Sequence, residues 1–363
     1  MHTIQPATNS IHNFNAGPSI LPKEVFEQAS QAILNYSDAG LSILEIGHRT
    51  PLFQSVMDEA RGLVRELMNL DADHEVLFLH GGASTQFMQV PMNLLDDKET
   101  AAYTDTGVWS GKAVKEAKLF GKVEIVCSSR EAGFTYIPKD FAVPNDAKYV
   151  HITTNNTIYG SQWQKIPHTS NVMIADMSSD ILSREMDFNK FGLIYAGAQK
   201  NMGAAGVNLV VVNKNILGKV KRSIPTILDY RNHIHEGSML NTPPVFAVYV
   251  CLLTLRWLKA QGGVLEMEKR NTEKAALLYN TIDSSSFFKG TIAKEDRSKM
   301  NVCFVMNDPS LESTFLDHAK ANGIVGIKGH RLSGGFRASL YNALPISSVE
   351  VLVDIMKEFE KRH

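Results

Sequence analysis

Apolar residues recur along the first two-thirds of the chain in two alternating patterns. Over residues 52–68 they return every three or four positions, which predicts an amphipathic helix with one buried face. The run 75–80 is apolar almost throughout, which favours a buried strand. Buried strands that alternate with helices are typical of a parallel sheet covered on both faces. The same patterns predict strands at 101–104, 123–127, 149–153, 172–175, 193–196 and 207–212, and helices at 22–36, 84–95 and 111–119.

The last third of the chain shows a different pattern. The apolar stretch 243–255 is shorter than the about 20 residues that a membrane span needs, so we expect a buried helix. The glycine pair 262–263 then marks a boundary. We therefore predict an α/β protein with a large, mostly parallel domain over 15–260, a smaller α+β domain over 261–363, and an arm over 1–14 that packs near the small domain. The small domain is expected to hold helices at 265–283, 311–322 and 347–361, and strands at 301–306 and 336–339.

Composition and charge argue against several classes of protein. The 363 residues carry 37 Lys and Arg against 38 Asp and Glu, a formal net charge of −1, and 44% of them are hydrophobic. This balance disfavours a disordered chain and a nucleic-acid binder. The cysteines Cys127, Cys251 and Cys303 are widely spaced, so we expect neither a disulfide framework nor a metal site. Because the N-terminus lacks a signal-peptide pattern, we expect a cytoplasmic protein without a membrane partner.

Three features together point to one cofactor. The small residues 81–85 lie between a predicted strand and helix, where free N–H groups can hold a phosphate, although an ordinary capped turn is the alternative. Asp176 follows a predicted strand, at the end where α/β proteins bind ligands, but a turn residue would look the same. Lys200 is flanked by small residues and amides, where a lysine can act as a nucleophile, but a solvated surface lysine is the usual alternative for such a residue taken alone. The presence of all three features in one chain favours the nucleophile. Pyridoxal phosphate needs a lysine, an acid for its pyridine nitrogen and a phosphate cradle.

Basic residues gather in short motifs elsewhere in the chain. His48 and Arg49 form one pair, His330 and Arg331 form another, and Arg337 follows soon after. A planar guanidinium binds a carboxylate or a phosphate through two hydrogen bonds. Small and apolar neighbours around Arg49 and Arg337 favour a cleft over ordinary surface charge.

Ten short motifs, spread over nearly the whole chain, resemble those of one protein family. They are NFNAGPS (13–19), GHR (47–49), HGGAS (80–84), TGVWS (106–110), NNTIYG (155–160), ADMSSDILSR (175–184), YAGAQKN (195–201), NTPP (241–244), GHR (329–331) and GGFRAS (334–339). With these motifs the chain resembles the phosphoserine aminotransferase family. Its members are class V pyridoxal-phosphate-dependent aminotransferases, and the resemblance implies their fold, the aspartate-aminotransferase-like fold type I.

The resemblance implies a role for each cofactor residue. Lys200 would be the catalytic residue that binds pyridoxal 5'-phosphate covalently and moves protons, and Asp176 would pair with the pyridine nitrogen. Trp109 would stack on the ring, and Thr157 would contact its hydroxyl oxygen. The phosphate would meet residues from two subunits, which implies a homodimer with shared active sites. These residues are Ala83, Ser84 and Gln199 from one subunit and Asn241 and Thr242 from the other.

The resemblance also implies the reaction. L-Glutamate would donate its amino group to 3-phosphohydroxypyruvate in a ping-pong transamination, giving O-phospho-L-serine and 2-oxoglutarate for serine biosynthesis. Arg337 would hold the α-carboxylate, and a basic pocket would hold the distal phosphate or carboxylate. The basic pocket would consist of His48, Arg49, His330 and Arg331. The resemblance leaves open whether 4-phosphohydroxy-L-threonine is also formed, for pyridoxine biosynthesis.

Three alternatives are weighed against this interpretation. A serine–glyoxylate-type aminotransferase would share the fold but would not need two GHR motifs. A cysteine desulfurase would need a cysteine on a mobile loop, whereas Cys303 lies in an apolar strand, where a buried thiol is expected. A non-catalytic binding module would be favoured only if Lys200 or Asp176 were missing. Trp163 has no role in any motif and is interpreted as a packing residue.

Overall fold

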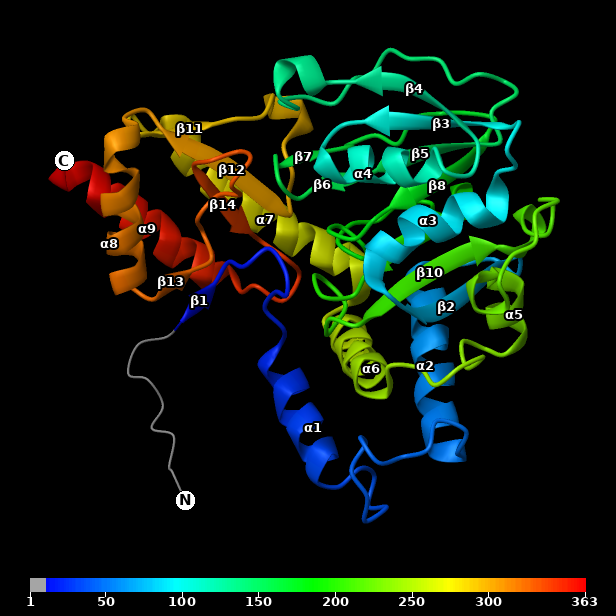
Figure 1. The fold of residues 1–363 in the computed structure, drawn as a ribbon. Helices are drawn as coiled ribbons and strands as arrows, with labels where there is room; N and C mark the ends of the chain where they lie inside the picture. Colours follow the sequence, from blue (N-terminus) through cyan, green and yellow to red (C-terminus); the bar gives the residue numbers. More distant parts are fainter. Residues whose placement is uncertain (1–10) are drawn as a thin grey trace.

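A seven-stranded sheet forms the centre of the computed structural model, which describes residues 11–363 (Figure 1). Most of the predicted arm 1–14 therefore lies outside the described residues. In spatial order the strands are β2 (His74–His80), β10 (Val207–Asn213), β9 (Leu193–Gly197), β8 (Val172–Asp176), β5 (Tyr149–Thr153), β3 (Thr100–Asp105) and β4 (Lys122–Ser128). Every strand predicted for the large domain is present within a few residues of its expected bounds.

One strand of the central sheet runs antiparallel to its neighbours. The strands β9, β8, β5, β3 and β4 pair in parallel, while β10 runs antiparallel to both β9 and β2. Only residues 198–206 join β9 to β10, and a parallel connection needs a dozen or more residues. The chain therefore turns back beside β9, and the expected mostly parallel sheet is confirmed with β10 as its exception.

Alternate residues of the strands face two separate hydrophobic cores. On β9, Tyr195 packs with residues of α3, α4 and α5, whereas Ile194 packs with residues of α1, α2 and α6 on the other face. This alternation explains why the strands are apolar throughout. The helices of these two layers are α1 (Lys23–Leu34), α2 (Pro51–Leu67), α3 (Gly82–Leu94), α4 (Val108–Ala117), α5 (Tyr230–His235) and α6 (Val245–Ala260).

A smaller antiparallel sheet lies in the last hundred residues. Its strands are β11 (Phe288–Gly290), β12 (Asn301–Met306) and β14 (Phe336–Ser339), and its helices are α7 (Gly263–Ser284), α8 (Glu312–Ala321) and α9 (Ile346–Arg362). Phe14 is fully buried in this core, because β1 (His12–Asn13) pairs with β13 (Ile324–Val325). Met267 of α7 belongs to the large core and Leu278 to the small one, so the boundary at 260/261 stays a prediction.

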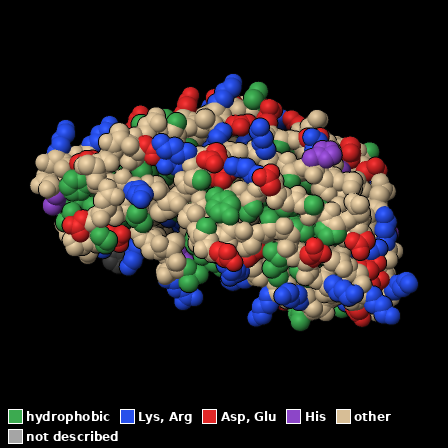
Figure 2. Space-filling view, turned by 90° about the horizontal axis from the view of Figure 1, so that it is seen from above, with side chains coloured by type: hydrophobic (Ala, Val, Ile, Leu, Met, Phe, Trp, Pro, Cys, Tyr) green, Lys and Arg blue, Asp and Glu red, His purple; other side chains and the backbone are tan. Residues whose placement is uncertain are grey.

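The surface carries charge of both signs. On the face shown in Figure 2, Lys and Arg side chains lie among Asp and Glu side chains, as the net charge of −1 suggests. Residues 11–363 contain no helix with both the length and the apolar character needed to span a membrane. The described residues also contain no cluster of three or more side chains suited to holding a metal ion.

Candidate active site

A cavity opens at the carboxyl ends of β5, β8 and β2, beside the turn that follows β9. It brings together seven of the predicted cofactor residues, which come from five different parts of the sequence. They are Ala83, Ser84, Trp109, Thr157, Asp176, Gln199 and Lys200. The carboxyl ends of parallel strands are where α/β proteins bind ligands, so the sheet itself accounts for the convergence.

Lys200 lies in the turn after β9, with its side chain in this cavity. Its Nζ donates a hydrogen bond to Thr157 Oγ1 over 2.7 Å. The pKa of Lys200 is lowered to about 8, mainly by burial; the Asp176 carboxylate opposes this shift, and the charge of Arg337 adds to it. A larger share of the amine is therefore neutral near neutral pH than for an ordinary lysine, which makes it a better nucleophile.

Asp176 is the last residue of β8 and is 5% exposed. Its Oδ1 accepts a hydrogen bond from the Ser178 N–H over 2.9 Å. Burial raises the pKa of this carboxyl, whereas the hydrogen bonds from Ser178 and the charge of Lys200 lower it. A cation placed against the carboxylate would stabilise its charged form in the same way.

The turn from β2 into α3 is a cradle for an anion. Gly81 has a φ of 92°, and a Cβ added there would lie 2.0 Å from Thr85 Oγ1. No side chain caps the N-terminus of α3, so its first N–H groups remain free for a ligand. Ala83 and Ser84 belong to this first turn and line the cavity. A phosphate fits this arrangement of small residues and free donors.

Three of the predicted substrate cations lie near one another. Arg337 Nη1 donates to the Thr157 carbonyl oxygen over 3.2 Å, and its buried Nε has no partner within residues 11–363. Burial lowers the pKa of His330, and so do the neighbouring charges of Arg337, Arg331 and Lys112. Arg337 is therefore adjacent to the Lys200 cavity, with free donors for a carboxylate.

The remaining four predicted site residues lie outside the lining of the cavity of their own chain. His48 and Arg49 precede α2, and Asn241 and Thr242 precede α6. A hydrogen bond of 2.8 Å from His80 Nε2 to the Thr242 carbonyl oxygen holds that loop beside the end of β2. A single copy of the chain therefore assembles the cofactor cavity without these four residues.

Sequence reasoning missed several polar residues of the cavity. Thr153 ends β5 directly beside Asp176, and its buried Oγ1 has no partner among the described residues. The strand-end rule that singled out Asp176 would also have found Thr153. Lys112 does not line the cavity, but its Nζ lies 4.3 Å from the centre of the Trp109 ring, which does. The two residues are three positions apart in α4, a spacing that brings helix side chains together.

Comparison with known proteins agrees with this geometry. The family model for class-V aminotransferases matches residues 11–352, and the chain belongs to that family. Phosphoserine aminotransferases from Flavobacterium johnsoniae and Bacteroides thetaiotaomicron are 58% and 57% identical to it, and each match covers 97% of this chain and 99% of the relative.

Solved structures give the same result. The phosphoserine aminotransferase of Bacillus circulans subsp. alkalophilus matches with a TM-score of 0.95 at 41% identity, covering 97% of this chain and 99% of its own. The phosphoserine aminotransferase of Trichomonas vaginalis, solved with PLP bound, matches with a TM-score of 0.90 at 34% identity, covering 96% and 100%. The predicted fold type I is thereby confirmed.

Proposed function

We propose that this protein is a pyridoxal-phosphate-dependent phosphoserine aminotransferase, which exchanges an amino group between L-glutamate and 3-phosphohydroxypyruvate. The observation that carries the proposal is one cavity that holds a lysine of lowered pKa, a buried carboxylate and an uncapped helix N-terminus, with Arg337 beside it. These are the groups that pyridoxal phosphate and an amino-acid carboxylate require. The likeness to phosphoserine aminotransferases supports the choice of substrate.

Each residue of the cavity has a task in this reaction. Pyridoxal phosphate, when bound, supplies a ring that accepts electrons from the substrate Cα. Lys200 would hold the cofactor covalently and then move the proton of the substrate Cα, with Thr157 Oγ1 orienting its Nζ. Asp176 would keep the pyridine nitrogen protonated, and Trp109 would cover the ring and exclude water. The turn 81–84 and Gln199 would bind the phosphate.

The substrate would be fixed at both ends. Arg337 would offer its Nε and Nη2 to the α-carboxylate, because among residues 11–363 only Nη1 is engaged with a protein group. His330 and Arg331, which lie near Arg337, would bind the distal phosphate or γ-carboxylate. The same positive field that lowers the pKa of His330 attracts a dianionic phosphate, which selects phosphoserine over serine.

We propose that a second copy of the chain completes the site. Large apolar side chains are exposed on α1, on the segment that connects α1 to α2, and in the first turn of α2. His48 and Arg49 lie within the connecting segment. The exposed apolar side chains are Phe26, Ile33, Leu34, Leu41, Leu44 and Leu52. Such a patch is typical of a surface that another chain covers. A homodimer would bury it and bring His48, Arg49, Asn241 and Thr242 to the partner's cavity.

The cysteine desulfurase alternative is disfavoured by the position of its required thiol. Cys303 lies in β12, is 5% exposed and donates from Sγ to the Ile158 carbonyl oxygen. Burial raises the pKa of this thiol to about 12, so the nucleophilic thiolate is scarce at neutral pH. All three cysteines are free, which supports the proposed cytoplasmic location.

Covalent labelling tests the cofactor proposal. The purified protein should be yellow, and borohydride reduction should fix the cofactor to the peptide that contains Lys200, as read by mass spectrometry. The Lys200→Ala variant should remain folded but carry no label. A colourless wild-type protein, or a label on a different lysine, would refute the assignment of Lys200.

A further inference from the structure

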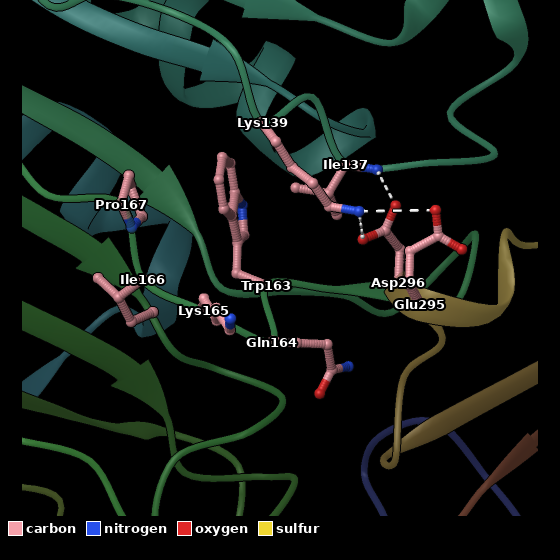
Figure 3. Close-up of a pocket in the computed structure, with 9 residues that line it drawn as sticks. All are labelled: Ile137, Lys139, Trp163, Gln164, Lys165, Ile166, Pro167, Glu295 and Asp296. Carbon is pink, nitrogen blue, oxygen red and sulfur yellow. Dashed lines mark hydrogen bonds and ion pairs between the residues drawn. The ribbon is translucent and has the colours of Figure 1, made fainter.

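A second cavity lies apart from the Lys200 site, where three distant segments meet (Figure 3). The segments are residues 137–139, 163–167 and 295–296, and none of the residues that line this cavity lines the cavity around Lys200. Its volume is about 470 Å³, within the range of small-molecule binding sites. Nothing in the proposed transamination uses it.

One wall of this cavity is built from groups that satisfy one another. Asp296 is 2% exposed, and its Oδ2 accepts a hydrogen bond from the Ile137 N–H over 2.9 Å. Lys139 Nζ lies 3.1 Å from Asp296 Oδ1 and 3.7 Å from Glu295 Oε1 (Figure 3). Lys139 pairs with both carboxylates and leaves this wall with one net negative charge, so a ligand carboxylate would lie away from it.

The opposite wall offers a buried donor without a partner. Trp163 is 3% exposed, and its Nε1 forms no hydrogen bond within residues 11–363. In Figure 3 the nitrogen-bearing edge of the indole faces the space between Trp163 and Lys139. A buried N–H without an acceptor destabilises the folded chain, because its hydration is lost and not replaced. A ligand that brings an acceptor atom to this position would remove this destabilisation.

Two further features define what such a ligand looks like. Lys165 lines the same cavity, is exposed, and forms neither an ion pair nor a side-chain hydrogen bond with any described residue. Ile166 and Pro167 continue the lining with apolar surface next to the indole ring. Gln164 also lines the cavity, with its amide nitrogen donating to the Arg297 carbonyl oxygen. Away from the Lys139 wall, the unpaired donors are thus the indole N–H and the Lys165 ammonium, beside the apolar surface of Ile166 and Pro167.

We propose that this cavity is a second binding site, for a small carboxylate with an apolar body. The carboxylate would accept a hydrogen bond from Trp163 Nε1 and pair with Lys165, while the apolar body would pack against Ile166, Pro167 and the indole. A dianion such as inorganic phosphate fits less well, because the apolar wall cannot replace its hydration. The site would bridge segments 137–139 and 163–167 to residues 295–296.

Titration of the cofactor-loaded protein with 3-phenylpropanoate tests the proposal. The chain has three tryptophans, whose indole N–H resonances in a ¹H–¹⁵N spectrum can be assigned with the variants Trp109→Phe, Trp163→Phe and Trp257→Phe. The Trp163 resonance should shift in a saturable way, while that of Trp257 stays in place. Lys165→Gln should weaken binding at least about fivefold, and the exposed Lys289→Gln should not change it.

The neutral amide 3-phenylpropanamide separates carboxylate recognition from simple burial of a ring. It should bind at least about tenfold more weakly than 3-phenylpropanoate, and inorganic phosphate should not shift the Trp163 resonance. The proposal is overturned if the Trp163 resonance does not move, if only Trp109 responds, or if the amide and the Lys165→Gln variant behave like the carboxylate and the wild type.

Discussion

Lys200 shows how much of the chemistry depends on the surroundings of one residue. The sequence predicted a lysine among small residues and amides, and the fold adds the hydrogen bond to Thr157 and the charges of Asp176 and Arg337. Strand ends and glycine turns made Asp176 and the cradle predictable from the sequence. The Lys112–Trp109 contact was missed because the helix was expected to begin at residue 111, whereas α4 begins at Val108 and contains both residues, three positions apart.

The lowered pKa of Lys200 has a direct consequence for its reactivity. Only the neutral amine reacts, so acylation of Lys200 in the cofactor-free protein should rise with pH and level off above the pKa of about 8. Competitive acylation, read by mass spectrometry, measures this profile. In Asp176→Asn the midpoint should move to lower pH, because the carboxylate that favours the ammonium is gone. A midpoint near 10, as in an ordinary lysine, would contradict the assignment.

At the scale of elements, periodicity identified the long helices and buried strands but not how they connect. The helix expected at 52–68 is α2 (Pro51–Leu67), and the strand expected at 149–153 is β5. The reversed direction of β10 could not be read from its sequence, because a buried strand has the same apolar pattern in either direction. The two-residue strands β6 (Asn155–Asn156) and β7 (Ser161–Gln162) are too short to show any period.

We expect cofactor affinity to depend strongly on the junction between β2 and α3. Gly81→Ala would place a Cβ 2.0 Å from Thr85 Oγ1 at a φ that side chains rarely adopt, so the cradle must shift. We expect the dissociation constant of pyridoxal phosphate to rise at least about tenfold. Gly133→Ala is the matched control, because Gly133 has a φ of 66° and open space around it. If both variants bound the cofactor as the wild type does, the cradle would not lie at Gly81.

At the scale of the whole molecule, the sites depend on contacts that no local pattern contains. Phe14 is buried in the core of the last hundred residues, and the Trp163 cavity joins three segments that are far apart in the chain. Conversely, His48 and Arg49 carry the right motif but do not line the Lys200 cavity of their own chain. Motifs therefore identified residues, and only the fold could tell which of them one chain brings together.

Complementation between two inactive variants tests the shared site. Lys200→Ala and Arg49→Ala should each lose nearly all activity as homodimers. After mixing, unfolding and refolding in equal amounts, random pairing should restore about a quarter of the wild-type sites, since each mixed dimer contains one intact site. Without any recovery in demonstrably mixed dimers, Arg49 would have to act within its own chain.

The central claim is that this aminotransferase selects a phosphorylated amino acid, and the half-reaction tests it most directly. The cofactor-loaded protein is mixed with O-phospho-L-serine, L-glutamate or L-serine in the absence of an amino acceptor, and the loss of its visible absorbance is followed with time. Phosphoserine and glutamate should bleach the protein with stoichiometric release of their oxo acids, and serine should react at least about a hundredfold more slowly. Equal rates for serine and phosphoserine would contradict the account.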